Sequence, residues 1–222
     1  MSIVHRRFLT LAEGVSWAVG LVGMAVWVSF QIGVASRTRQ DLDRFDALQV
    51  EAPHQATPEP HHATSDRSLW SPVRVSAWLK VSSEPGPAPL AVLRIPKIQL
   101  EVPVLPGTDD RTLDRGLGHI EDTALPGTGG NSGIAGHRDG FFRGLKDIVP
   151  GDTIELDTLD GKEMYLVEQT WVVDPEDVSV LDPTPTSTRV LTLVTCYPFY
   201  FVGSAPSRFI VRARHVSDKP PP

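Results

Sequence analysis

The chain has 222 residues, a formal net charge of −6 at pH 7 and a single cysteine. This length allows one compact domain with a smaller segment beside it, and the mildly acidic balance excludes the broad basic surface typical of nucleic-acid-binding proteins. One cysteine excludes an intramolecular disulfide, and the 20 prolines favour strands and loops over a helical bundle.

The first predicted element is a membrane span at residues 14–36, where "GVSWAVGLVGMAVWVSFQIGVAS" contains no charged residue. Its length matches the roughly 20 residues that cross a bilayer, so we expect a cytoplasmic N-terminus at 1–13 and an anchor at 14–36. A cleaved signal peptide is the alternative, because "VAS" resembles a cleavage motif, although signal peptides have an apolar region of only about 7–15 residues. Arginines flank the segment on both sides, so charge does not orient it.

Residues 37–67 are predicted to be a juxtamembrane helix followed by a linker. Helical spacing places three apolar side chains on one face, namely Leu42, Phe45 and Leu48. The following "EAPHQATPEPHHATSD" is rich in proline, histidine and threonine, which is typical of a linker. Its histidines lack the cysteine or carboxylate spacing that would fix a metal geometry, so we interpret them as solvated.

Residues 68–89 are predicted to form a short amphipathic helix and a turn. Pro72 suits the first helical turn, where its missing N–H does no harm, and "SSEPGPAP" ends the helix. The side chains at helical intervals are Trp70, Val73, Arg74, Ala77, Trp78 and Val81. We expect this face to pack its tryptophans against the domain.

From Leu90 to Val216 the pattern changes to short strands separated by glycine and proline. The segments that read as strands are "LAVLRIP", "IQLEVPVL", "SGIAGH", "DTIELDT", "EMYLVEQTWVV", "RVLTLVTC" and "RFIVRARHV". Short helices are expected only near residues 111–115 and 141–145. Many short strands with few helices predict an all-β domain at 90–216, a closed barrel or a sandwich, followed by a Pro-rich tail at 217–222.

Three polar residues stand at predicted strand ends: His137, Cys196 and Arg208. A thiolate is a nucleophile, and a nearby imidazole can act as its base or stabilise it when charged. A guanidinium can donate hydrogen bonds to a developing oxyanion. Each residue alone has an ordinary explanation, since a lone cysteine is usually a small buried hydrophobe. Only their combination points to nucleophilic acyl transfer.

The sequence around these residues resembles the sortases, the cysteine transpeptidases of bacterial surfaces. "TLVTC" matches their TLxTC signature, "AGHRDGFF" resembles the segment around their active-site histidine, and "SAPSRFIV" resembles the strand with their active-site arginine. The longer string "TCYPFYFVGSAPSRFIV" is most similar to class D sortases. The resemblance extends from about Leu90 to His215.

The resemblance implies a closed eight-stranded β-barrel with short helices. It also implies that Cys196 attacks the carbonyl of a sorting motif in the C-terminal tail of an exported protein, forming a thioacyl intermediate. His137 would protonate the leaving amine and later take a proton from an incoming amine of the cell envelope, while Arg208 holds the substrate or its oxyanion. This chemistry needs no cofactor and no metal, and the loop carboxylates Asp174, Glu176 and Asp177 have no spacing that demands one.

Further residues are candidates for the substrate groove. Thr195 precedes the nucleophile and could donate a hydrogen bond near it, Tyr197 follows it, and His119 in "GLGHIED" is a groove-lining candidate at most. Asp139 is a weak candidate for a third member of a triad, because neighbouring residues in a strand point to opposite faces. Arg212 and Arg214 share a face with Arg208 by the same alternation.

"ALPGTGG" at residues 124–130 contains LPGTG, which looks like the LPxTG motif that many sortases cleave. A sorting signal is followed by an apolar stretch and a basic tail at the C-terminus, whereas this segment lies in mid-domain. We interpret it as a Gly/Pro turn before the strand that carries His137.

A sortase acts on exported proteins, so the resemblance implies an N-terminus inside the cell and a catalytic domain outside the cytoplasmic membrane. A thiol protease dominated by hydrolysis remains an alternative, because water competes with the amine for any thioacyl intermediate. A non-catalytic envelope-binding barrel of the same fold is the other alternative, and the presence of all three site residues argues against it.

Overall fold

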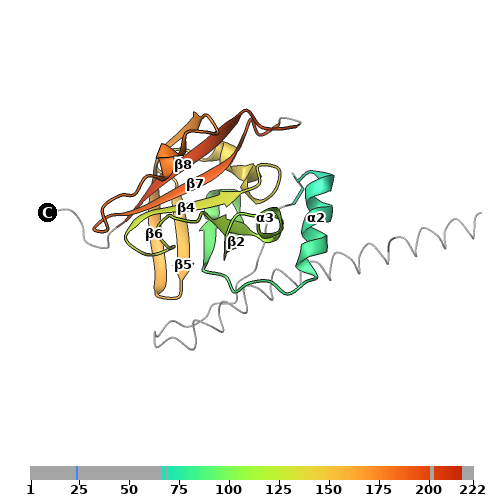
Figure 1. Ribbon diagram of the computed structural model, residues 1–222, viewed down its shortest axis with the longest axis horizontal. Coiled ribbons are helices and arrows are strands. Elements are labelled where there is room, and N and C mark those ends of the chain that lie inside the picture. The colour runs from blue at the N-terminus through green and yellow to red at the C-terminus, as the bar shows by residue number, and fades with distance from the viewer. Residues whose placement is uncertain (1–23, 25–66, 69, 201–202, 217–222) are drawn as a thin grey trace, which may run out of the picture. The chain divides into compact units, whose positions relative to one another are not determined.

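The computed structural model describes residues 24, 67–68, 70–200 and 203–216 (Figure 1). The predicted anchor at 14–36 lies outside the described residues except for Met24, as do nearly all of the linker at 37–67 and the tail at 217–222. Among the described residues, no helix combines the length and hydropathy needed to cross a membrane.

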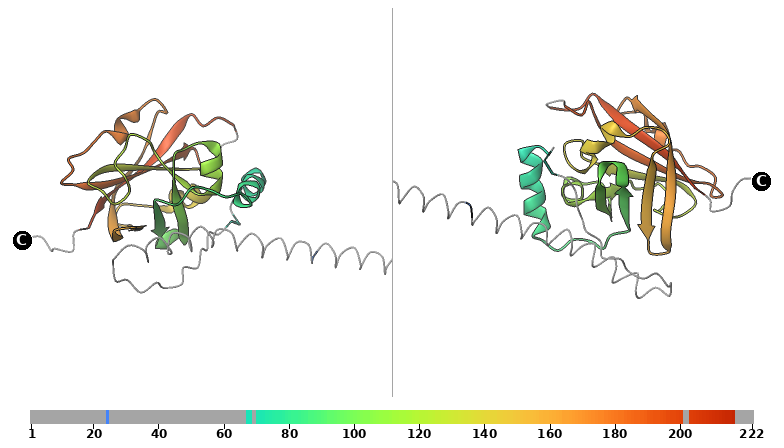
Figure 2. Two further views of the ribbon diagram at one scale, coloured as in Figure 1. Left: turned by 60° about the horizontal axis from the view of Figure 1, so that its bottom comes forward. Right: turned by 180° about the vertical axis from the view of Figure 1, so that it is seen from behind.

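The domain is a closed barrel of eight strands, in the order β1-β2-β3-β4-β7-β8-β6-β5 (Figures 1 and 2). The strands are β1 Ala91–Ile95, β2 Leu100–Pro106, β3 Leu117–His119, β4 Gly130–Gly136, β5 Thr153–Thr158, β6 Gly161–Val173, β7 Arg189–Tyr197 and β8 Ser207–His215. The predicted all-β barrel is therefore confirmed. Strand β3 was not expected from the strand pattern, because its three residues are too few to show an alternation.

The barrel core follows the alternation of apolar residues in the strands. In β6, Tyr165 and Val167 are buried, whereas Met164 and Leu166 between them are exposed. Leu93 and Leu193 are among the apolar side chains with no exposed surface. Burial of each such side chain stabilises the fold by about 1.5–3 kcal/mol.

The register of three neighbouring strands sets the position of the site. Strands β4 and β7 are parallel and pair Gly136 with Thr195, so both strands reach the same edge of the barrel together. Strands β7 and β8 are antiparallel and pair Cys196 directly with Arg208. These pairings place the ends of β4 and β7 beside the start of β8.

The helices are short and lie outside the strands. They are α2 Pro72–Ser82, the 3₁₀ turn η1 Pro96–Ile98, α3 Asp110–Arg115, and the further 3₁₀ segments η2 Phe141–Asp147 and η3 Val178–Leu181. The helices expected near residues 111–115 and 141–145 are α3 and η2. Helices α2 and α3 pack against each other beside the barrel (Figure 1).

Helix α2 forms where the sequence predicts an amphipathic helix. Ser71 caps its N-terminus by accepting a hydrogen bond from the backbone N–H of Arg74 at 3.2 Å, and Pro72 occupies the first turn. Trp78 is only 1% exposed, and Trp70 packs edge-on against Phe141 at a centroid distance of 4.6 Å.

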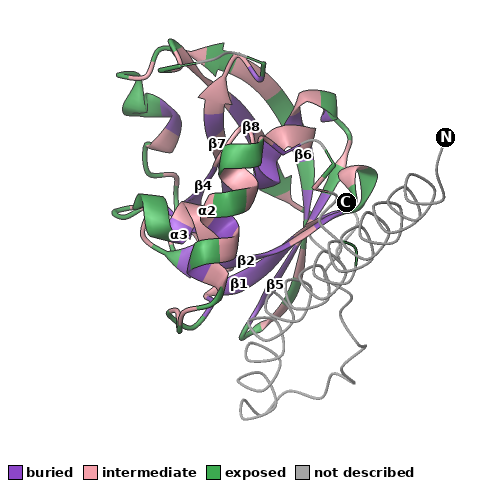
Figure 3. Cartoon of the chain, turned by 90° about the vertical axis from the view of Figure 1, so that its right-hand side faces the viewer, coloured by how far each residue is buried: buried purple, intermediate pink, exposed green. Residues whose placement is uncertain are grey.

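Val73, which the helical spacing places on the packed face, is instead 75% exposed. The buried face of α2 is centred on Trp78 and Val81, and five residues of helix turn Val73 about 140° away from Trp78. Figure 3 shows the exposed and buried faces of this helix. Val73 is therefore free to line a groove on the surface.

Candidate active site

Cys196 and Arg208 face each other across the β7–β8 pair. Directly opposed residues in an antiparallel pair have Cβ atoms about 4.5–5.5 Å apart and project from the same face. The guanidinium of Arg208 donates to the carbonyl oxygens of Ser207 at 3.1 Å and Ala205 at 3.4 Å. Among the described residues no carboxylate pairs with Arg208, so its charge remains available to a bound anion.

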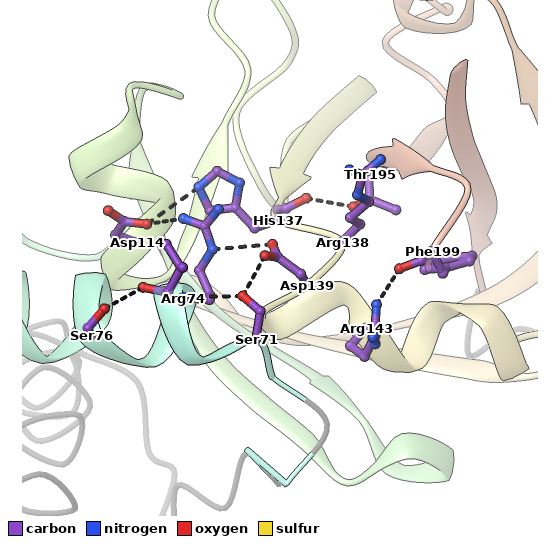
Figure 4. Close-up of polar contacts among 12 residues, drawn as sticks. Ser71, Arg74, Ser76, Asp114, His137, Arg138, Asp139, Arg143, Thr195 and Phe199 are labelled. Atoms are coloured by element: carbon purple, nitrogen blue, oxygen red, sulfur yellow. Dashed lines mark hydrogen bonds and ion pairs between the residues drawn. The ribbon is translucent and has the colours of Figure 1, made fainter. Parts of the chain in front are cut away.

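His137 follows directly after β4 and is fixed beside Cys196 by the end of the β4–β7 pair. The hydroxyl of Thr195 donates to the carbonyl oxygen of Gly136 at 2.7 Å, which links the residues preceding Cys196 and His137 (Figure 4). The carbonyl of His137 accepts hydrogen bonds from the N–H groups of Gly140 and Phe142 at 3.1 and 3.2 Å. The backbone that carries the imidazole is therefore held from both sides.

His137 and Cys196 line one groove of about 580 Å³. Helix α2 contributes Val73 and Arg74 to its lining, and the loop between β7 and β8 contributes aromatic side chains such as Phe199. The groove is large enough to hold several atoms of an extended peptide around the sulfur, and it brings the thiol and the imidazole to one surface. Arg208 does not line this groove, but it is the direct cross-strand partner of Cys196.

The loop between β7 and β8 is tied to the segment that follows His137. Arg138 donates to the carbonyl oxygen of Gly203 at 2.8 Å. Arg143 donates to the carbonyl oxygen of Phe199 and lies over the ring of Tyr200 at 4.2 Å. These contacts hold the aromatic loop against the histidine side of the groove.

An apolar strip continues from Cys196 along the outer face of the barrel. The register aligns Ala135 with Val194, which lies two residues before Cys196, whereas the next partner across the sheet, Ile210, is fully buried. Side chains two residues apart in a strand share a face, and Ala135 and Val194 are partly exposed. No sequence motif marks this strip.

The loop between β6 and β7 lies over the far part of this face. Asn131 and Arg212 both donate to the carbonyl oxygen of Val180 in η3, Asn131 at 3.1 Å. A Cβ on Gly133 would come within 2.9 Å of Leu181, so the absence of a side chain there allows the loop to pack closely. Arg212 thus anchors a loop, although it shares a face of β8 with Arg208.

The ring of His137 lies among opposite charges. Its Nε2 is buried without a hydrogen-bond partner and lies 3.6 Å from the Oδ1 of Asp114 in α3. Burial lowers the pKa of His137 and the positive charge of Arg74 lowers it further, whereas the carboxylates of Asp114, Asp139 and Asp110 raise it; the net shift is downward.

Asp139, a weak candidate for a third catalytic residue, lies in the turn after His137 and contacts α2. Its Oδ2 accepts from the hydroxyl of Ser71 at 2.8 Å and its Oδ1 from the Nε of Arg74 at 3.3 Å. Burial alone would raise the pKa of Asp139, but these two partners outweigh it and lower the pKa. The carboxylate that faces the imidazole is that of Asp114, which no sequence motif marked.

None of the three residues predicted to contact substrate lines the groove. Thr195 is 2% exposed, and its hydroxyl is engaged with Gly136. His119 is 7% exposed, and its Nε2 lies within hydrogen-bonding distance of the carbonyl oxygen of Ala124 at 3.0 Å and the hydroxyl of Thr123 at 3.1 Å. Neither lines the groove; His119 secures the loop before β4.

Tyr197, the third of these residues, packs in an aromatic cluster next to Cys196. Its ring lies 5.9 Å from that of Phe199 and 6.2 Å from that of Phe209. Tyr197 also lines a cavity of about 260 Å³ together with Pro198 and Tyr200. The cluster supports the start of the β7–β8 loop.

The LPGTG-like segment is a closed turn, as predicted. The N–H and the hydroxyl of Thr128 both donate to the carbonyl oxygen of Leu125, at 3.0 and 2.8 Å. A Cβ on Gly129 would lie 2.0 Å from the carbonyl oxygen of Thr186. The Thr128–Gly129 bond is therefore packed against another loop rather than presented as an extended peptide.

Replacing Thr195 with valine is expected to lower the free energy of unfolding by about 1–3 kcal/mol, because the carbonyl of Gly136 loses its hydroxyl donor inside the protein. Valine preserves the shape of the side chain, so urea denaturation isolates the hydrogen bond. Thr170→Val in the partly exposed part of β6 is the matched control and should change stability by less. Equal decreases in the free energy of unfolding in the two variants would show that the Thr195 hydrogen bond does not stabilise the fold.

Within the described ranges no group of three histidine, cysteine, aspartate or glutamate side chains could hold a metal ion. The protein is of the class of closed eight-stranded barrels with a thiol and an imidazole in one groove, and an arginine pairs with the cysteine across the sheet. The chain belongs to the sortase family, because a sequence model of the sortase domain matches residues 93–216.

Two curated proteins are similar to this chain. Sortase D of Bacillus subtilis is 37% identical over 126 residues, covering 57% of this chain and 63% of that protein. Sortase A of Streptococcus agalactiae is 27% identical over 112 residues, covering 47% of this chain and 45% of its own length. The chain thus spans less than two thirds of the length of these relatives.

Solved structures agree on the fold. The Clostridium perfringens Sortase D5 transpeptidase matches with a TM-score of 0.57 at 24% identity, over 80% of this chain and 98% of that one. A lid mutant of Sortase A from Corynebacterium diphtheriae matches with a TM-score of 0.55 at 28% identity, over 82% and 94% of the two chains.

Proposed function

We propose that the chain is a membrane-anchored cysteine transpeptidase that attaches exported proteins to an amine of the cell envelope. The observation that carries this proposal is the convergence of Cys196 and His137 on one groove, with Arg208 paired directly to Cys196. All three residues lie inside the part of the chain that matches the sortase domain.

The first half of the reaction is acylation of Cys196. The thiolate sulfur attacks the carbonyl carbon of the scissile peptide bond, and the carbonyl oxygen becomes an oxyanion that accepts hydrogen bonds from Arg208. When the C–N bond breaks, His137 gives its proton to the leaving amine. The products are a thioester on Cys196 and a released C-terminal peptide.

The second half transfers the acyl group. An envelope amine attacks the thioester carbonyl and loses a proton to His137, and the C–S bond then breaks to restore the thiolate. A new amide forms, and the imidazole regains the proton that it lost in the first half. Water in place of the amine gives hydrolysis, so the outcome depends on which nucleophile reaches the groove.

We infer that the substrate peptide leaves the groove at Cys196 along the apolar strip beside it. An extended segment laid along Ala135 and Val194, which lead away from Cys196 and are partly exposed, would point alternate side chains towards the barrel. The β6–β7 loop, held through Val180, would enclose the part of the peptide that precedes the scissile bond. Recognition would therefore favour an extended motif with an apolar residue a few positions before that bond.

The location of the protein follows from its proposed substrates. Residues 14–36 would anchor it in the cytoplasmic membrane with the N-terminus inside, and the linker at 37–67 would let the barrel stand off from the bilayer on the outside. The single thiol suits an oxidising compartment, because the chain offers it no disulfide partner.

The test is to trap the acyl-enzyme. The full chain in detergent is incubated with a library of extended peptides, and intact-mass spectrometry measures adducts on Cys196 that hydroxylamine removes. Adding triglycine or a diamino acid should convert the adduct into an amide product. Adducts that only hydrolyse would support a thiol protease, and an unmodified Cys196 with every peptide would support a binding barrel and refute the proposal.

A further inference from the structure

Arg74 of helix α2 lies between two carboxylates that flank His137. Its Nη1 forms an ion pair with the Oδ1 of Asp114, and its Nε donates to Asp139 at 3.3 Å. The stem of Arg74 rests on Gly140, where an added Cβ would lie 3.1 Å from the Cγ of Arg74. Figure 4 shows this arginine reaching from α2 to both acidic side chains.

One oxygen of Asp114 serves both the arginine and the histidine. Oδ1 is the atom that pairs with Arg74, and the same Oδ1 lies 3.6 Å from the Nε2 of His137. That distance is just beyond a hydrogen bond, and Nε2 is buried without any other hydrogen-bond partner. A shift of less than 1 Å would bring the two into hydrogen-bond contact.

Backbone and side-chain hydrogen bonds hold helix α2 in place at both ends. The backbone N–H of Ser71 donates to the carbonyl of Asp139 at 3.3 Å. At the other end, Arg115 of α3 donates to the carbonyl oxygens of Val81 and Glu84 at 3.1 and 2.6 Å. The helix therefore forms a fixed wall of the groove that delivers a positive charge beside the imidazole.

We propose that Asp114 is a positioning residue for His137, and that Arg74 determines how much of the negative charge of Asp114 reaches the imidazole. The catalytic part of this inference rests on the proposed transpeptidase function. Asp114 would hold the Nε2 edge of the ring, leaving Nδ1 to exchange protons with the leaving and incoming amines. A carboxylate that faces the far nitrogen also stabilises the imidazolium form.

The charges of Asp114 and Arg74 act on the imidazole in partly buried surroundings. The side chains of Asp114, Arg74 and His137 are 15%, 19% and 18% exposed, so water screens them less than it screens charges on an open surface. Arg74 opposes protonation of the ring and Asp114 favours it. The charged or titratable groups around the ring are Arg74, Asp110, Asp114, Arg138, Asp139, Arg143, Cys196 and Arg208.

The test measures the pKa of His137 by NMR in the full chain, with the imidazole carbons of histidine labelled with ¹³C and the His137 signal assigned from a His137→Gln variant. Asp114→Asn should lower the pKa of His137, because it removes the attractive charge. Arg74→Gln should raise it, both directly and by freeing Asp114. The rise should be smaller in the Asp114→Asn background, since nothing remains to be freed.

Asp110→Asn is the matched control, because Asp110 lies on the same helix and makes no ion pair with His137. It should shift the pKa of His137 much less than Asp114→Asn does. Equal shifts in the two variants would overturn the inference. Should Asp114→Asn fail to fold, Arg74→Gln still decides, because an unchanged or lowered pKa would contradict the proposed role of Arg74.

Kinetics give the second readout. Asp114→Asn should lower kcat by roughly 10-fold with little change in KM, less than the ~10²–10⁴-fold expected for loss of the general acid itself, and its pH profile should move with the pKa. If the wild type is active and Asp114→Asn has the same kcat, the positioning role is refuted and the proposed function is not. A wild type that processes no peptide would refute the proposed function, and the NMR titration would still test the contact.

Discussion

Replacing Cys196 with alanine is expected to abolish acyl transfer, with a loss of at least about 10³-fold, because Cys196 carries the only thiol of the chain and the proposed thioester forms on it. Rates are measured as the formation of amide product from a peptide and an amine. The intact-mass adduct should also disappear. The effect should be on chemistry alone, since the other residues that line the groove are unchanged.

The fold should survive this substitution. Cys196 is only partly buried, so removal of one sulfur atom is expected to change the free energy of unfolding by less than about 1 kcal/mol. That corresponds to a shift of about 2–4 °C or less in the melting temperature of a domain of this size. An alanine variant that is much less stable but still turns over substrate while folded would show that Cys196 is structural rather than catalytic.

Replacing Arg208 with lysine is expected to reduce kcat by roughly 10²-fold, the loss typical of a missing oxyanion donor. Lysine keeps the charge but offers a compact ammonium in place of a planar fork, so hydrogen bonds to a developing oxyanion are lost. Peptide affinity should change less than kcat, because the apolar strip is intact. The comparison needs kcat and KM measured separately.

Arg214→Lys is the matched control for this experiment. Arg214 lies on the same face of β8 but is 62% exposed and pairs with Glu168 at 2.8 Å, away from the groove. Its replacement should leave kcat unchanged. Near-normal rates in Arg208→Lys, or equal losses in both arginine variants, would contradict a role for Arg208 at the oxyanion.

Much of the fold could be read from the sequence because its strands carry their own signals. Alternation in β6 and the Gly/Pro punctuation between strands predicted where the chain extends and turns. Strand β3 gave no such signal, since three residues do not establish a period. The prediction that Val73 packs against the domain was wrong. The six residues at helical spacing cover a wider part of the helix surface than the face that is buried.

The site was only partly predictable, because some of its residues lie in sequence motifs and others come together only in the folded protein. Cys196, His137 and Arg208 stand in recognisable motifs, whereas Asp114 and Arg74 approach His137 only after α2 and α3 have docked. Thr195 was assigned to the substrate because it precedes the nucleophile. Alternation along β7 already directs it to the other face from Cys196, and the structure uses its hydroxyl to join two strands.

The parallel pairing of β4 with β7 has a consequence for how the protein matures. The hydroxyl bond between Thr195 and Gly136 joins residues 59 positions apart in the chain, and contacts of such long separation form late, since loop closure must precede them. Until the barrel closes, Cys196 lacks the neighbouring imidazole that would activate it. A newly synthesised chain would thus carry an ordinary, unactivated thiol, and its reactivity would appear only when folding is complete.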